Sequence, residues 1–282
     1  MSILFLLFIQ STDNDIITIF IAALFLMIAY FSFRMAEMVY VFKKRRPLYL
    51  HPYLKLKKLP KSQKVILINQ FSFYKKLNQR QQRYFEHRVY NFIEDKTFIG
   101  RQDQVIDDEV KVLISSTAVM LTFGFRDYFI GLIDKIFVYP EAYYSKLNDD
   151  YHEGEFNPQL EALVLSWKHF KKGYDIDNDN LNLGVHEFSH AIHLNSIKER
   201  DVSSSIFSDS YKELIELLSN NEALRLRLIE TRYFRDYAYT NQYEFVAVII
   251  ESFIESPDEI RNQFPMIYQK VKQMLNFNFA GY

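Results

Sequence analysis

The sequence has no cysteine and is poor in glycine and proline. Among its 282 residues there are 0 Cys, 7 Gly and 7 Pro. The lack of thiols excludes disulfides, thiolate zinc sites and a cysteine nucleophile, so a transition metal must be held by His and carboxylates. Because 49% of the residues are hydrophobic, most of the chain is expected to fold compactly. A net charge of -1 argues against direct nucleic-acid binding.

Charge is also absent from residues 16–33, IITIFIAALFLMIAYFSF. A polar cluster over residues 10–15 separates this segment from a shorter apolar run. The segment is long enough to cross most of a bilayer core, and it predicts a transmembrane helix within an N-terminal anchor of residues 1–42. A buried core helix is disfavoured because every face is apolar. A cleaved signal peptide is disfavoured because no basic residue precedes the segment and no clear cleavage site follows it.

Residues 43–64 contain nine Lys and Arg residues but no Asp or Glu. The only charged side chains before the apolar segment are those of Asp13 and Asp15. The positive-inside rule therefore predicts a single-pass membrane protein with its main domain in the cytoplasm. Three prolines in the basic segment indicate an extended linker rather than a helix. The same segment can also lie on anionic lipid headgroups. The main domain is expected over residues 65–282.

That domain shows helical spacing in most of its length and β-like runs in two places. Helices are expected over residues 77–94, 107–124, 211–218, 222–232, 242–254 and 265–275, with Asp107 or Asp108 as the cap of the second. The β-like runs cover residues 135–139 and 162–167. A polar loop at 175–180 precedes a further helix. The expected fold class is therefore α+β and mostly helical.

This further helix carries the pentapeptide His186-Glu187-Phe188-Ser189-His190, an HExxH motif. Residues four apart lie above one another on a helix, so both imidazoles can bind one metal ion. Glu187 then lies beside the ion, where it can accept a proton from water. His193 is a third histidine within eight residues. The alternative to a metal site is that His186 and His190 are hydrogen-bonded structural residues. The intervening Glu187 favours the metal site. The motif predicts a zinc hydrolase.

A catalytic zinc site needs a third protein ligand. In this chain Asn195 and Ser196 occupy the stretch where HExxHxxGxxH would supply it. A carboxylate from the later helix is the next candidate, and Glu244, Glu251 and Glu255 are available there. Glu244 and Glu251 are seven apart and share a face. Glu244 also has an alternative as part of a capping box that begins three residues earlier. Spacing alone leaves the choice between Glu244 and Glu251 open.

Several ordered segments between Leu77 and the C-terminus carry a family resemblance. They are FIEDKTFIG at 92–100, IFVYP at 136–140, VLSW at 164–167, NLGVHEFSH at 182–190, YEFVAV at 243–248 and ESFIESP at 251–257. Together they resemble the Mlc titration factor A family of zinc-dependent peptidases, which is related to the catalytic domain of anthrax lethal factor. The resemblance implies a zincin-like metallopeptidase domain.

The resemblance also implies roles for individual residues. The glutamate that opens the EFxAV helix is the third metal ligand in that family, which here is Glu244. A tyrosine seven residues earlier lines the family's site, which here is Tyr237, and its phenol can stabilise an oxyanion. Glu251 then becomes a candidate for orienting a ligating His. The family usually has Asp where this chain has His193. We expect His193 either to replace that carboxylate beside a ligating residue or to face solvent, and not to be a ligand itself.

The expected function is therefore hydrolysis of peptides or proteins by a membrane-anchored enzyme. Zn²⁺ on His186, His190 and Glu244 would activate water, with Glu187 as general base. The family's name records sequestration of a transcriptional repressor. A regulatory protein that holds such a partner at the membrane is the alternative function.

Overall fold

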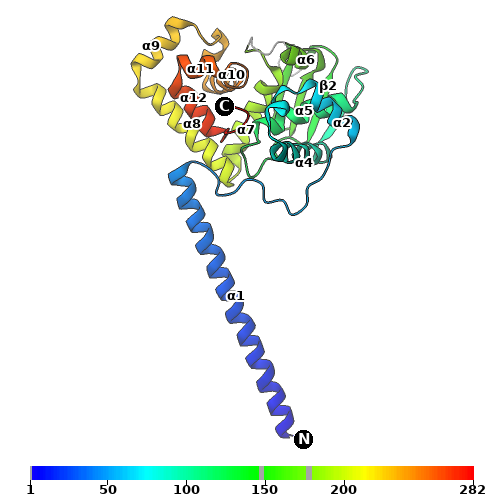
Figure 1. Cartoon of the computed structure of the whole chain (residues 1–282), viewed down its shortest axis with the longest axis vertical. Coiled ribbons are helices and arrows are strands. Elements are labelled where there is room, and N and C mark those ends of the chain that lie inside the picture. The colour runs from blue at the N-terminus through cyan, green and yellow to red at the C-terminus, as the bar shows by residue number, and fades with distance from the viewer. Residues whose placement is uncertain (1, 146–148, 176–179) are drawn as a thin grey trace. The chain divides into compact units, whose positions relative to one another are not determined.

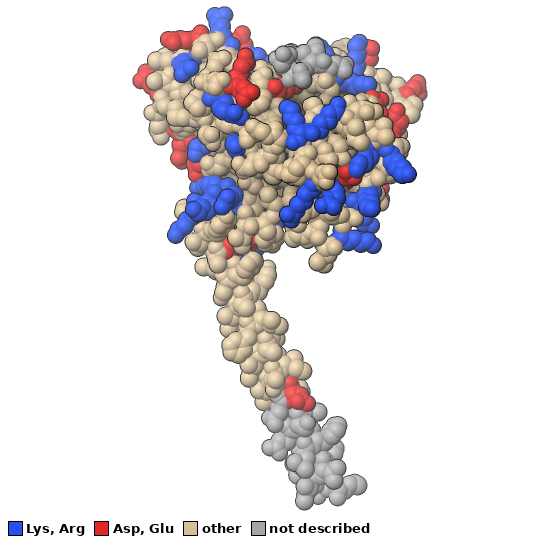
Figure 2. Space-filling view, in the orientation of Figure 1, with Lys and Arg blue, Asp and Glu red and all other residues tan. Residues whose placement is uncertain are grey.

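The computed structural model describes residues 2–145, 149–175 and 180–282. The chain divides into two compact units, Met1–Leu48 and Tyr49–Tyr282, and each is considered by itself. Acidic and basic side chains are both scattered over the visible face of the second unit, whereas most of the first unit shows uncharged residues (Figure 2).

The first unit consists mainly of α1 (Ser2–Lys44) (Figure 1). Its part Asp15–Lys44 is long and apolar enough to cross a membrane. The polar cluster at residues 10–15 separates two apolar runs of the sequence, and the helix continues through it. Residues 45–60 contain neither helix nor strand. Within the segment 43–64, Lys43 and Lys44 belong to α1, and residues 61–64 open the next helix.

Four helices begin the second unit: α2 (Lys61–Gln70), α3 (Ser72–Lys76), α4 (Gln79–Asp95) and α5 (Asp108–Leu121). The start of α4 is fixed by a capping box between Asn78 and Gln81. The start of α5 is fixed by Asp107, whose side chain accepts from the Val110 N–H at 2.9 Å. The helices expected over residues 77–94 and 107–124 are thus confirmed, with ends shifted by a few residues.

A four-stranded sheet has the order β1-β2-β6-β5. Its strands are β1 (Thr97–Gly100), β2 (Lys135–Tyr139), β5 (Gly154–Asn157) and β6 (Ala162–Ser166). The first three in that order run parallel, and β5 pairs antiparallel with β6 at the edge. A separate hairpin pairs β3 (Tyr143–Ser145) with β4 (Asp150–His152). The two expected strands are confirmed, and four others were not predicted.

The remaining elements are helical: α6 (Trp167–Asp175), α7 (Leu183–Lys198), α8 (Val202–Asn220), α9 (Glu222–Thr231), the 3₁₀ turn η1 (Asp236–Tyr239), α10 (Gln242–Glu255), α11 (Pro257–Gln263) and α12 (Pro265–Met274). Of the polar loop expected at 175–180, residues 176–179 lie outside the described residues. The prediction of a mostly helical α+β fold is confirmed.

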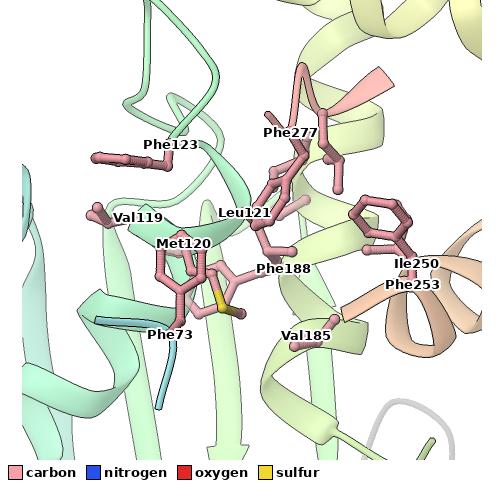
Figure 3. Close-up of a cluster of buried hydrophobic side chains, with 14 of the residues drawn as sticks. Phe73, Val119, Met120, Leu121, Phe123, Val185, Phe188, Ile250, Phe253 and Phe277 are labelled. Atoms are coloured by element: carbon pink, nitrogen blue, oxygen red, sulfur yellow. The ribbon is translucent and has the colours of Figure 1, made fainter. Parts of the chain in front are cut away.

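Helix α7 lies in the middle of the second unit and packs against α5, α8, α10 and β5 (Figure 1). Val185 and Phe188 of α7 are fully buried and meet apolar side chains from α5 and α10, with Phe253 among them (Figure 3). This core fixes the helix that carries the HExxH motif. Burial of each such large side chain contributes about 2 kcal/mol.

Gly124 permits a close approach between the end of α5 and the C-terminal segment. A Cβ at this position would lie 2.3 Å from the carbonyl oxygens of Leu275 and Asn276. We predict that Gly124→Ala lowers the free energy of unfolding by about 3 kcal/mol, because backbone has to move. Urea unfolding followed by the fluorescence of Trp167, the single tryptophan, measures the change.

Gly131→Ala provides the control, since a Cβ there would meet its nearest atoms at 3.6 and 3.7 Å. Equal stability of the two variants would contradict the prediction.

Candidate metal centre

The start of α7 is fixed by Asn182. Its side-chain oxygen accepts from the Val185 N–H at 3.0 Å, and its amide nitrogen donates to the Gly173 carbonyl at 2.8 Å. The Asn182 backbone N–H donates to Glu251 Oε2 at 3.0 Å. This cap places His186 one turn into the helix, facing α10.

The structure brings His186, His190 and Glu244 together. The two Nε2 atoms are 3.0 Å apart, and Glu244 Oε2 lies 3.1 Å from His186 Nε2 and 3.4 Å from His190 Nε2. One candidate ligand atom from each residue lies within 4.8 Å of the others. Glu244 is the third residue of α10, where the Asn241 side chain accepts from its N–H at 3.0 Å. The cap thus orients the backbone, while the Glu244 carboxylate faces both imidazoles.

Glu251 lies behind His186. Its Oε1 is 2.6 Å from His186 Nδ1, and the carboxylate forms a two-point ion pair with Arg235 at 2.8 and 3.2 Å. Only 1% of Glu251 is exposed. Because a buried carboxylate is costly without partners, Arg235 is part of the centre. Sequence reasoning missed Arg235, and the only signal was that a buried Glu251 would need a cation.

The charge arrangement fits a bound divalent cation. With its Nδ1 engaged by Glu251, His186 directs Nε2 to the point shared with His190 and Glu244. Burial disfavours a charged imidazole, but the bonds to Glu244 and Glu251 outweigh burial and raise the pKa of His186 to about 9. Burial likewise opposes ionisation of Glu244, yet the two imidazoles hold its pKa well below the usual range. Two imidazole nitrogens and one carboxylate oxygen form a ligand set that Zn²⁺ prefers.

Glu187 is held against the sheet edge. It is buried, and burial is the main reason that its pKa is raised. The backbone of Phe156 in β5 acts in the opposite direction and favours the charged carboxylate. A Cβ at Gly154, also in β5, would lie 3.0 Å from Glu187 Cγ. The edge strand therefore approaches the HExxH helix closely enough to fix the Glu187 side chain.

Tyr237 lies in η1 on the open side of the centre. Its ring centroid is 6.0 Å from that of His186, and its hydroxyl lies near the Glu244 carboxylate. Half of the residue is exposed. Burial of the remainder and the charge of Glu244 raise its pKa to about 12, so its hydroxyl stays a hydrogen-bond donor at neutral pH.

A cleft of about 800 Å³ opens onto these groups. His186, Glu187 and Tyr237 line it, together with Gly154 at the start of β5, the preceding Glu153 and side chains of α6. In its wall His169 Nε2 lies 3.1 Å from Glu153 Oε1. The cleft is large enough to take several residues of a peptide.

His193 lies apart from the His186, His190 and Glu244 group. Its ring packs among aromatic rings of α8 and α10, with centroid distances of 4.3 Å to Tyr211, 5.1 Å to Tyr243 and 5.8 Å to Phe207. It is 2% exposed, and neither ring nitrogen has a hydrogen-bond partner among the described residues. Its position is that of a core residue.

Acid should destabilise the protein through His193. Burial lowers its pKa from 6.5 to about 4, so between these pH values the unfolded chain binds a proton that the folded protein does not. Stability is therefore lost as the pH falls through this range, by up to about 3 kcal/mol from this residue. We predict that the free energy of unfolding of the His193→Phe variant changes less with pH than that of the wild type. Urea unfolding at pH 4 to 7 measures it. Parallel curves for variant and wild type would contradict this.

Comparison with known proteins agrees with the geometry. Residues 42–276 match the family model of the glucose-regulated metallopeptidases M90. The chain is also 27% identical over 237 residues to an uncharacterized protein of Synechocystis sp., covering 76% of this chain and 83% of that protein. The resemblance to the Mlc titration factor A family is confirmed. The chain therefore belongs to the M90 family of metallopeptidases.

Proposed function

We propose that this metallopeptidase is a zinc enzyme in which His186, His190 and Glu244 hold the ion. The observation that carries the proposal is the convergence of the two Nε2 atoms and Glu244 Oε2 at one point. When bound there, Zn²⁺ supplies Lewis-acid polarisation of the scissile carbonyl and lowers the pKa of water. Glu251, supported by Arg235, keeps the His186 ring in the orientation that this requires.

The chain's own residues then carry the proton transfers. Glu187 accepts a proton from the attacking water, and its raised pKa suits delivery of that proton to the leaving amine. Tyr237 donates its hydroxyl hydrogen bond to the developing oxyanion. Its half-exposed position on the open side of the cleft lets it adjust to a bound substrate.

The substrate is proposed to be an extended peptide or an unfolded protein segment. Strand β5 ends the four-stranded sheet, and its first residue lines the cleft. A peptide that pairs with the outer side of β5 as an added strand would run past Glu187. The M90 family match supports peptide or protein substrates in general.

We further propose that α1 anchors the enzyme in a membrane, with the second unit in the cytoplasm. The apolar segment Asp15–Lys44 supports the anchor. The basic residues that follow it support the cytoplasmic side. The site does not depend on this arrangement, because its residues all belong to the second unit.

Replacing the general base tests the mechanism. Glu187→Gln should lower peptide hydrolysis by roughly 10²–10⁴-fold, because the amide cannot accept the proton of water. Zinc content should remain one ion per chain, since the three ligands are unchanged. Fluorogenic peptides measure the rate, and elemental analysis measures the metal. The exposed Glu94→Gln of α4 serves as the control. Full activity of pure Glu187→Gln protein would sink the assignment.

A second test concerns Glu251. Glu251→Gln should weaken zinc binding by roughly 10–100-fold, because the neutral amide no longer draws the His186 Nδ1 proton. Competition with a chromogenic chelator gives the affinity. Glu230→Gln, an exposed change on α9, should leave it unaltered. If the two variants bind zinc equally well, Glu251 does not support the metal ligand.

A further inference from the structure

The second unit exposes apolar side chains close to its start. Leu54 is fully exposed, Tyr49 is 41% exposed and Phe129 is 43% exposed. Leu54 belongs to the segment without helix or strand that precedes α2, and Phe129 to the loop after α5. Large apolar side chains gathered at one place on a surface mark a contact site.

These side chains belong to neighbouring segments held by one buried residue, Arg88 of α4. Its guanidinium donates to Tyr53 Oη at 2.6 Å and to the Leu50 carbonyl at 3.2 Å. It also donates to the Phe125 carbonyl at 2.7 Å and lies 4.4 Å from the centre of the Tyr128 ring. The segment at residues 49–54 and the loop at 125–129 therefore lie side by side.

The two segments also touch directly, since the Arg126 guanidinium lies 4.9 Å from the Tyr49 ring centre. Three lysines flank the apolar side chains, and Lys55, Lys57 and Lys58 are all exposed. The sequence has no Asp or Glu from residue 38 to residue 85. Asp127, the acidic residue of the neighbouring loop, is paired with Arg126 at 3.3 Å. We call Tyr49, Leu54, Lys55, Lys57, Lys58 and Phe129 the tether-proximal surface.

The chain keeps this surface close to the end of the apolar helix. An extended chain spans at most about 3.5 Å per residue, so Tyr49 lies within about 18 Å of Lys44 and Leu54 within about 35 Å. The headgroup region on each side of a bilayer is itself several ångströms deep. If α1 spans a membrane, the tether-proximal surface can therefore reach the lipid headgroups.

We infer that the tether-proximal surface binds the bilayer that holds α1, through anionic lipid headgroups. The three lysines would neutralise lipid phosphates or carboxylates, while Leu54 and Phe129 enter the boundary between headgroups and acyl chains. This inference rests on the membrane anchoring proposed above and is independent of the zinc chemistry. It would give the cleft a fixed orientation toward the membrane surface.

The absence of cysteine makes a direct test possible, because one introduced cysteine is the only site of labelling. Full-length Leu54→Cys protein carries an environment-sensitive fluorophore and is reconstituted into vesicles of phosphatidylcholine alone or with 30% phosphatidylglycerol. In the anionic vesicles we expect a blue-shifted emission and protection from aqueous iodide. Leu226→Cys on α9 is the control, since Leu226 is half exposed and Figure 1 places α9 on the side of the unit away from α4.

Charge dependence is tested by replacing Lys55, Lys57 and Lys58 with Gln in the labelled protein. Each lysine near an anionic surface changes the binding equilibrium roughly fivefold, so the triple variant should return the label to water. Added salt should act in the same direction. A Leu54 label that stays exposed in both kinds of vesicle overturns the inference, as does equal protection in neutral and anionic vesicles.

Vesicle flotation separates this inference from the anchoring proposal. If the protein floats with both kinds of vesicle but the label is unprotected, the anchoring proposal is supported and lipid binding by the tether-proximal surface is contradicted. Flotation with anionic vesicles alone contradicts the anchor, and with it the inference, which requires a bilayer that holds α1. Flotation with neither removes both. Peptide hydrolysis, assayed in detergent, reports on the zinc site separately.

Discussion

A buried carboxylate holds the candidate metal centre together. Glu251 of α10 meets the backbone of Asn182 at the start of α7, the imidazole of His186 and the guanidinium of Arg235 beside η1. A charge taken out of water is tolerated only when such partners surround it. Displacement of α7 or of the segment that carries Arg235 would therefore remove part of the set of partners that stabilises this buried charge. The orientation of His186 and the position of Tyr237 both follow from this constraint.

The site shows which features residue spacing can predict and which it cannot. HExxH spacing places His186 and His190 on one helix, so their shared direction is a local property that a sequence can predict. Spacing could not rank Glu244 against Glu251, because residues seven apart share a helix face. In the structure Glu244 reaches the Nε2 atoms, whereas Glu251 reaches Nδ1 on the other side of the ring. The family resemblance named Glu244, and its role as a ligand stays a prediction.

The same distinction applies to the secondary structure: some elements are determined by their own residues, and others by contacts with distant parts of the chain. Helices with a cap and an apolar stripe, such as α4 and α5, were predictable from their own residues. Strand β5 was not, since four residues carry little periodic signal and their partners come from β6 and α7. The contact between Glu187 and the Phe156 backbone was missed for that reason. The polar cluster at 10–15 interrupts the hydrophobic run of the sequence without interrupting helix α1.

Few other residue types could replace Asn182. All four of its hydrogen-bonding groups are used: the backbone N–H on Glu251, the backbone carbonyl on the His186 N–H, the side-chain oxygen on Val185 and the side-chain nitrogen on Gly173. Aspartate would keep the cap but lose the amide donor and bring a second negative charge beside Glu251. Serine would cap without reaching Gly173, and glutamine is too long to cap. None of these residues would therefore replace asparagine here, although Asn182 is not one of the three candidate metal ligands.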